Sequence, residues 1–288
     1  MNEVLNDGKI ANENSTAIAM GAALFDPKSA ESKYGEIPFV VVPDGYHVED
    51  LERMLANPVR KRAAVVVSDS DSFIAYCKKH ALKDDATIYA AIEPEQQTLS
   101  IVAVLDDHDA ILVGGTPHWR DHTCTFQPKR AVEWTRWNGK NKQQMTQADF
   151  ATWLEDNLSD IASVPGMPSG QDMLQMALGF EANSDKRVKS RINLQNGSVR
   201  FEFVEDETKD TRTSMEVFQR FSLGLPVFDG STSAYQLDAR LKYRKKEGKV
   251  NFWFELIRPD RVFKSAVAEE LAKIGEGTSL MIVNGKPW

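Results

Sequence analysis

A cluster of histidine, cysteine and aspartate side chains near the middle of the chain has the residue types that bind metal ions or transfer protons. The run Asp106-Asp107-His108-Asp109 is followed by His118, His122 and Cys124. If residues 118–126 are extended, the last three share one face, because side chains alternate along a strand. If the segment is helical, His118 and His122 share a face instead. Either geometry would offer ligands to zinc or iron.

A structural role explains the same cluster. No glutamate accompanies the histidine pair as in the H-E-x-x-H metal helix, and Gly114-Gly115 with Pro117 favours a loop followed by a strand. Residues 106–109 would then form a polar turn between two strands, with Arg120 and Asp121 pairing at a strand start. The chain also has no P-loop, dinucleotide-binding or nucleophile-elbow motif. We therefore predict no catalytic residues and no cofactor.

The last third of the chain contains a candidate binding surface. The tetrapeptide Lys246-Glu247-Gly248-Lys249 separates two runs of alternating apolar and polar residues, a pattern typical of a hairpin with a two-residue turn. That turn would place Leu241 opposite Phe254 on a face directed toward the core. The other face would carry a set of basic residues and one indole, which we predict as nucleic-acid ligands: Arg240, Lys242, Arg244, Lys246, Lys249 and Trp253.

This predicted set of ligands has both a functional and a structural interpretation. The basic side chains would neutralise phosphates, while Trp253 would stack on a base or make a cation–π contact with Lys242. Alternatively, the strip is a solvated sheet face on which the aliphatic stems of the basic residues cover the indole. The sequence leaves both interpretations open.

An earlier hairpin is predicted by Asn196-Gly197, because this dipeptide favours a type I′ turn. The turn would place Leu194 opposite Val199. It would also place the face that carries Arg187, Lys189 and Arg191 opposite Asp206, Val204 and Glu202. Cross-strand ion pairs would largely neutralise that face, which makes it a poor track for phosphates.

Composition places the chain among globular proteins. Its 288 residues are enough to bury a sizeable core, with 42% hydrophobic and 27% charged residues. Two cysteines form no disulfide framework, and no apolar run approaches the roughly 20 residues that span a bilayer. The first ten residues have no apolar h-region typical of a secretory signal. We therefore expect a cytoplasmic protein with no membrane partner.

Charge is unevenly distributed along the chain. Residues 1–165 hold 16 basic and 25 acidic residues, a net charge of −9, whereas residues 166–288 hold 19 and 17, a net charge of +2. Two domains with ordinary surfaces would explain this distribution. The alternative is a bipolar molecule whose acidic part repels polyanions while its C-terminal part binds them.

The pattern of elements predicts an α+β fold in four segments. Residues 1–35 form a flexible N-terminal segment, 36–163 a mixed α/β region, 164–170 a Pro- and Gly-rich linker, and 171–288 an antiparallel sheet with flanking helices. Alternating runs between 188 and 257 predict an antiparallel meander that includes one strand over 213–223. A helix from Pro259 would pack on it, and a last strand over 279–283 would close the sheet.

Several separate segments resemble the YfdQ-like proteins of phages and prophages. They are Ile37-Pro-Phe-Val-Val-Val-Pro-Asp-Gly45, Asp71-Ser-Phe-Ile-Ala-Tyr76, Trp119-Arg-Asp-His122, Leu223-Gly-Leu-Pro-Val-Phe228 and Phe254-Glu-Leu-Ile-Arg-Pro259. The resemblance runs from about Ile37 to the C-terminus. It implies a phage accessory protein of unknown function, acting in the bacterial host cytoplasm, and it identifies no catalytic or binding residues.

Three functional hypotheses follow. The first is a non-enzymatic phage or prophage accessory protein that self-associates, through the Met-rich segment 167–180 or a sheet edge, and binds nucleic acid through its C-terminal sheet. The second is a counter-defence protein that sequesters a host defence protein or a nucleotide signal. The third is a metal-dependent enzyme at the cluster of His118 and His122, with Cys124 as a further ligand candidate.

Overall fold

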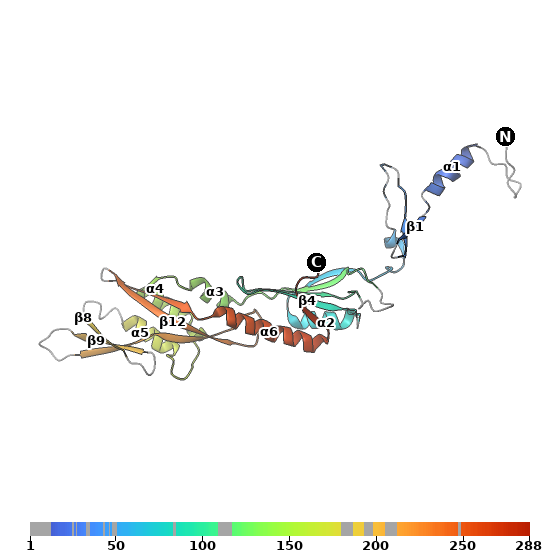
Figure 1. Cartoon of the computed structure of the whole chain (residues 1–288). Helices are drawn as coiled ribbons and strands as arrows, with labels where there is room; N and C mark the ends of the chain where they lie inside the picture. The colour runs from blue at the N-terminus through green and yellow to red at the C-terminus, as the bar shows by residue number, and fades with distance from the viewer. Residues whose placement is uncertain are drawn as a thin grey trace. The chain divides into compact units, whose positions relative to one another are not determined.

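The chain divides into two compact units, residues 1–61 and 62–288, in the computed structural model (Figure 1). The structure describes residues 13–24, 26, 28–32, 35–42, 44–45, 47, 51–82, 85–108, 117–179, 187–192, 198–204, 212–246 and 249–288. The fold class is α+β, as the sequence predicts. The predicted linker 164–170 lies inside the second unit.

The first unit contains one helix, one hairpin and a short 3₁₀ turn among its described residues. They are α1 (Glu13–Leu24), β1 (Lys28–Ser32), β2 (Gly35–Phe39) and η1 (Glu52–Met54). Strands β1 and β2 pair antiparallel, with Lys28 opposite Phe39. Many apolar side chains of this unit are exposed, including Met54 and Val59.

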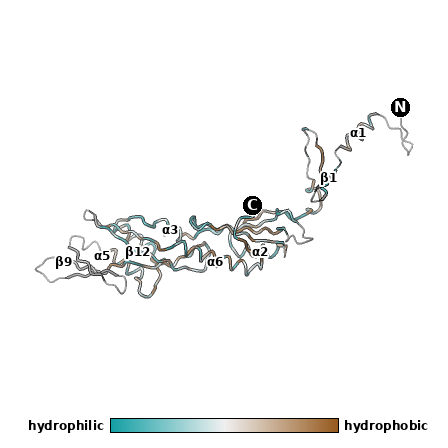
Figure 2. The backbone as a smooth tube through the Cα atoms, in the orientation of Figure 1, coloured by the Kyte–Doolittle hydropathy of each residue, from teal (hydrophilic) through white to brown (hydrophobic). Residues whose placement is uncertain are grey.

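A five-stranded sheet forms one part of the second unit. It contains β3 (Ala63–Val67), β4 (Thr87–Glu93), β5 (Thr98–Val104), β6 (His122–Phe126) and β14 (Met281–Asn284), in the order β14-β4-β5-β6-β3. Its core face packs against α2 (Ser70–His80) and α6 (Pro259–Thr278), and hydrophobic residues recur along its strands (Figure 2). Asp69 caps α2 by accepting a 2.7 Å hydrogen bond from Ser72 N.

The C-terminal strand joins a different sheet from the one that the sequence predicts. Strand β14 pairs parallel with β4, with Ile282 opposite Ile88. The prediction that this strand closes the C-terminal sheet is therefore wrong. The physical reason is the length of α6, which carries the chain onto α2, where Gly277 lies so close to Ile74 that an added Cβ would come within 2.7 Å of it.

A second, four-stranded sheet contains the predicted C-terminal hairpin. Its strands are β7 (Met145–Thr146), β11 (Arg220–Leu225), β12 (Tyr235–Lys246) and β13 (Lys249–Leu256), in the order β11-β12-β13-β7. Leu241 lies opposite Phe254, which confirms the predicted register. Lys246 pairs with Lys249, which leaves a two-residue connection whose residues lie outside the described part of the chain.

Helices cover the inner face of this sheet with an aromatic layer. They are α3 (Val132–Lys140), α4 (Gln147–Asp156) and α5 (Gly170–Gly179), with the 3₁₀ turn η2 (Leu158–Asp160) between the last two. The ring centroid of Trp137 lies 5.0 Å from that of Phe254, and Phe150 stacks on Phe252 at 5.1 Å. Thr146 caps α4 as predicted, accepting a hydrogen bond from Asp149 N.

The remaining strands form a separate three-stranded sheet, so the predicted continuous meander is wrong. This sheet contains β8 (Arg187–Ile192), β9 (Ser198–Val204) and β10 (Arg212–Phe218), in the order β10-β9-β8. The single strand predicted over 213–223 breaks at Gln219 into β10 and β11. The break follows from burial by different partners, because Phe221 and Leu223 pack in the aromatic layer and Ile161 bridges Leu223.

The register of the first hairpin also differs from the prediction. Val199 pairs with Ile192 rather than with Leu194, a shift of two residues. A shift of two keeps the same residues on each face, because side chains alternate with a period of two. Lys189 now lies opposite Glu202, and the predicted Asn196-Gly197 turn lies outside the described residues.

We predict that Phe254→Ala lowers the free energy of unfolding by about 3–5 kcal/mol, because it removes a fully buried ring from the aromatic layer. Lys242→Ala, on the exposed face of the neighbouring strand, is the control, and we expect it to change that free energy by less than about 0.5 kcal/mol. Urea unfolding followed by circular dichroism measures both. Equal effects of the two substitutions would contradict the assignment of the faces.

Candidate functional site

The three metal-ligand candidates occupy two separate environments. Strand β6 begins at His122, so His118 precedes the strand and does not share its alternation. His118 Nε2 lies 2.9 Å from Asp85 Oδ2, and both side chains are about one quarter exposed, at 25% and 24%. The structure therefore does not bring His118 together with His122 and Cys124 on one strand face.

His122 and Cys124 lie under α2 on the buried face of β6. His122 Nε2 is 3.0 Å from the hydroxyl of Tyr76, and the His122 ring lies 5.4 Å from the His80 ring. Burial raises the pKa of the Cys124 thiol to about 11 and contributes most to raising that of Cys77 to about 12. Both thiols are thus protonated at neutral pH, whereas metal binding and nucleophilic attack require a thiolate. No group of three or more His, Cys, Asp or Glu side chains within the described residues has the geometry to hold a metal ion.

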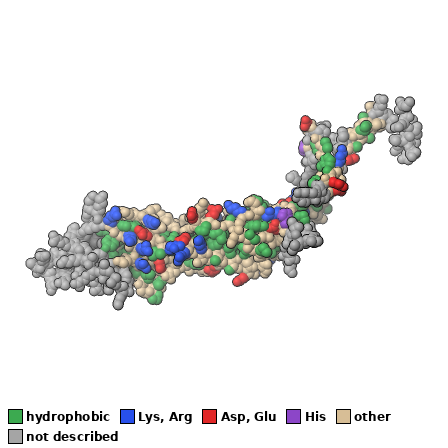
Figure 3. Space-filling view, viewed as in Figure 1, with side chains coloured by type: hydrophobic (Ala, Val, Ile, Leu, Met, Phe, Trp, Pro, Cys, Tyr) green, Lys and Arg blue, Asp and Glu red, His purple; other side chains and the backbone are tan. Residues whose placement is uncertain are grey.

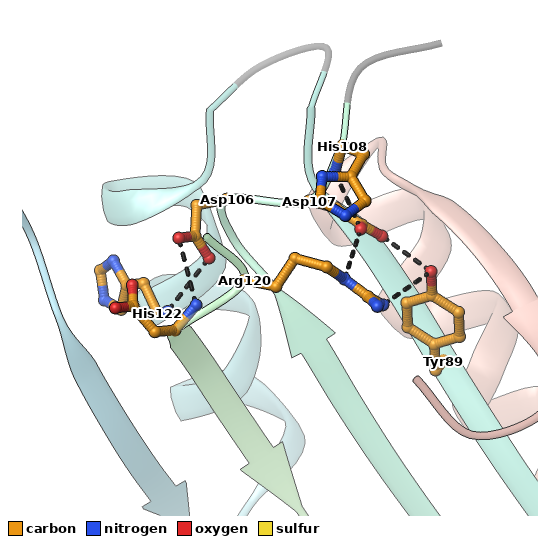
Figure 4. Close-up of polar contacts among 7 residues, drawn as sticks. Tyr89, Asp106, Asp107, His108, Arg120 and His122 are labelled. Atoms are coloured by element: carbon orange, nitrogen blue, oxygen red, sulfur yellow. Dashed lines mark hydrogen bonds and ion pairs between the residues drawn. The ribbon is translucent and has the colours of Figure 1, made fainter. Parts of the chain in front are cut away.

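Asp107 is the centre of a polar cluster at one end of the five-stranded sheet (Figure 4). Asp107 is 5% exposed, and its carboxylate receives a 2.7 Å hydrogen bond from the Tyr89 hydroxyl. Arg120 Nε lies 2.8 Å from Asp107 Oδ1, and the guanidinium also donates to the Tyr89 hydroxyl at 3.4 Å. Arg120 therefore pairs with Asp107, and not with Asp121 as the structural interpretation of the sequence suggested.

Asp106 joins the same two chain segments from the other side. Its carboxylate accepts hydrogen bonds from the backbone N–H groups of Asp121, at 3.2 Å, and His122, at 3.0 Å. Arg120, with φ +58°, adopts the left-handed conformation immediately before these donors. Asp106 and Asp107 follow β5, and Arg120, Asp121 and His122 lie at the start of β6, so the cluster ties the end of β5 to the start of β6. This arrangement supports the structural interpretation of the 106–121 cluster.

The outer face of the four-stranded sheet carries the predicted basic residues. Arg240, Lys242 and Arg244 are exposed, and they lie opposite Glu255, Trp253 and Asn251 respectively. Trp253 is partly buried, whereas its strand neighbours Phe252 and Phe254 are fully buried in the core. Lys246 and Lys249 pair in the ladder, but their side chains lie outside the described set. Lysine and arginine side chains gather over the region where Figure 1 places β12, with some acidic ones among them (Figure 3).

The structure adds Arg220 to this surface, which sequence reasoning missed. Arg220 is exposed and lies opposite Arg240 in the β11–β12 ladder. The sequence does not indicate that Arg220 lies on this face, because it predicts one continuous strand through this residue. Farther along the same ladder the face carries the acidic residue Asp238, whose carboxylate accepts hydrogen bonds from Ser222 and Gln236, and Gln236 also donates to the Ser222 hydroxyl. We call Arg220, Arg240, Lys242, Arg244 and Trp253 the basic sheet face.

The fold and its surfaces define an α+β protein with an exposed, basic, tryptophan-bearing sheet face. The chain belongs to the family described as "Uncharacterized conserved protein (DUF2303)", which matches residues 11–287. The match includes most of the N-terminal segment that lies outside the resemblance seen from Ile37 onward. No curated protein and no solved structure matches the chain at a significant level. Among the residues described, no helix is long and apolar enough to cross a membrane.

We predict that the Asp107 cluster makes stability depend on acid pH. Burial by itself raises the pKa of this carboxyl, but hydrogen bonds from Tyr89, His108 N–H and Thr87, together with the Arg120 charge, outweigh burial and hold the pKa below its usual value. The stabilisation is complete above the unfolded-state pKa of about 3.9 and is lost as the pH falls through the folded-state pKa.

The measurement is urea unfolding of the wild type and of Asp107→Asn at several pH values between about 6 and 3. The wild type should be more stable than the variant at the upper end, and the difference should shrink on acidification. A difference that stays constant over this range would show that Asp107 is not stabilised as an anion.

Proposed function

We propose that the protein binds single-stranded nucleic acid through the basic sheet face. The observation that carries the proposal is the β12–β13 register, which sets Arg240, Lys242 and Arg244 side by side with Trp253 on an exposed surface. Cationic side chains along a strand follow a phosphate backbone, and an indole on a sheet face offers a platform for an unpaired base. A base within a duplex is already stacked, and therefore the indole favours a single strand.

Charge around the face supports a salt-sensitive mode of binding. Four of its members are cations, and Glu255 lies opposite one of them, Arg240. The whole chain carries a net charge of −7, so attraction of a polyanion depends on this local surface and not on the molecule as a whole. Because phosphate contacts release condensed counterions, affinity should fall steeply with added salt.

The biological setting belongs to the same proposal. The YfdQ-like resemblance supports a phage or prophage accessory protein that acts in the bacterial host cytoplasm, and the chain's two cysteines fit a reducing compartment. We also propose self-association through a sheet edge. Two methionines of the segment 167–180, Met173 and Met176, are buried within the chain's own core, so this segment offers less apolar contact surface than its composition suggests.

The experiment is fluorescence anisotropy with a labelled single-stranded oligonucleotide over a range of salt concentrations. Arg240→Ala, Lys242→Ala and Arg244→Ala should each weaken binding equally across sequences and reduce the salt slope by about 0.7, the value for one phosphate contact on a single strand. Lys78→Ala on α2, which removes an exposed lysine from another surface, is the matched control and should bind like the wild type.

The tryptophan is tested separately. Trp253→Ala should reduce binding by on the order of 1–3 kcal/mol if a base stacks on the indole, whereas Trp288→Ala removes an indole that is 76% exposed elsewhere and should have no effect. An absence of binding at low salt, or equal binding by the triple variant of the three cations, would contradict the proposal. Capture of a host protein would then become the leading account.

A further inference from the structure

Strand β3 forms one edge of the five-stranded sheet, and its outer side is apolar. It pairs parallel with β6, and no other described strand lies beside it. Its sequence, Ala-Ala-Val-Val-Val over residues 63–67, contains neither a charged residue nor a proline, the features that usually keep edge strands from pairing with other chains. Val66 is 77% exposed, and Ala64 on the same face is exposed as well. An apolar edge of this kind is a template for a further strand.

The backbone groups of Ala64 and Val66 point to the free side of this edge. Ala63 N–H donates to the carbonyl oxygen of Asp121 at 3.2 Å, which directs the backbone of Ala63, and of every second residue after it, toward β6. The N–H and C=O groups of the residues in between therefore point away from β6. A further strand would bond to the sheet through these two residues.

We propose that β3 is the docking site for β3 of a second copy of the chain, paired antiparallel about a two-fold axis through Val65. The inference rests on the proposed self-association through a sheet edge and assigns the edge. Ala64 would lie opposite Val66 of the second copy, and the two residues would exchange both backbone hydrogen bonds. Ala63 would lie opposite Val67, so every facing pair is apolar. The result is one continuous sheet of ten strands, five from each copy.

Charge at the two ends of β3 favours the antiparallel arrangement. Lys61 and Arg62 precede the strand, and Asp69 follows it. An antiparallel partner would bring Lys61 opposite Asp69 of the second copy, whereas a parallel partner would place the two basic ends side by side. Asp69 is exposed, and hydrogen bonds from Ser72 hold the pKa of its carboxyl below the usual value, so it is an anion at neutral pH.

The other described sheet edges fit a second copy less well. Strand β14, at the opposite edge of the same sheet, has four residues and ends at Asn284. In the four-stranded sheet, edge strand β11 begins with Arg220 and is bridged at Leu223 by Ile161, while β7 has two residues. Each edge strand of the two remaining sheets carries at least one charged residue. Of these edges, β3 is the longest without a charge.

The first test is analytical ultracentrifugation of the full chain over a range of concentrations, in which the wild type should form a dimer. Val66→Pro removes an N–H that would bond to the second copy but none that bonds to β6, so it should raise the dimer dissociation constant about tenfold or more. Val66→Thr keeps the N–H and the branched shape, and this matched control should dimerise like the wild type. Thermal unfolding verifies that both variants are folded.

Cysteine cross-linking tests the register without a proline. Ala64→Cys and Val66→Cys put thiols at facing positions whose Cα atoms would lie about 5.5 Å apart, within the roughly 4.4–6.8 Å that disulfides span. The two variants, mixed, left to exchange copies and oxidised with diamide, should therefore cross-link. Each variant alone should cross-link far less, because its own thiols would lie diagonally at about 7–8 Å. The native cysteines, Cys77 and Cys124, are buried.

The outcomes separate this inference from the proposals on which it builds. A monomer at every concentration would overturn both the self-association and the assignment of its edge. A dimer that Val66→Pro leaves unchanged, or cross-linking no greater in the mixture than in either variant alone, would overturn the assignment to β3 and leave self-association through another edge standing. Triple substitution of Arg240, Lys242 and Arg244 should leave the dimer intact even where it abolishes binding of an oligonucleotide.

Discussion

The aromatic layer under the four-stranded sheet is the contact on which the rest of the C-terminal architecture depends. The ring centroid of Trp137 lies 6.0 Å from that of Phe221 and 5.0 Å from that of Phe254. The Trp137 indole N–H also donates a 2.8 Å hydrogen bond to the buried carboxylate of Asp160. Because a slip of one residue would turn every side chain of a strand to the opposite face, burial of these rings fixes the register. The exposed position of the basic residues is the consequence.

Helix α6 links the four-stranded sheet to the five-stranded sheet. Near its middle, Glu269 accepts hydrogen bonds from Tyr235, the first residue of β12, and from Ser233, which precedes the strand. Farther along the helix, Lys273 Nζ lies 2.8 Å from Asp71 Oδ1 on α2. One helix thus contacts elements of both sheets and delivers the chain to β14.

The sequence predicts what local chemistry determines and misses what tertiary packing decides. The Glu247-Gly248 dipeptide in the sequence and the alternation around it are sufficient to predict that Leu241 lies opposite Phe254 and that Trp253 lies on the outer face. Helix α3 was not predicted, although Trp134 and Trp137, three residues apart, mark its buried face. The parallel pairing of β14 with β4 joins segments nearly 200 residues apart, and no local pattern encodes it. For the His118–Cys124 segment, residue types alone could not show that Arg120 pairs with Asp107.

The central claim is that the register of β12 and β13 creates the surface that meets nucleic acid. Ultraviolet cross-linking of the native protein to a single-stranded oligonucleotide, with the linked peptide identified by mass spectrometry, tests this claim directly. The account predicts that the main cross-linked peptide contains Trp253 and that added salt reduces its yield. Cross-links confined to other surfaces of the second unit, or none at low salt, would contradict it.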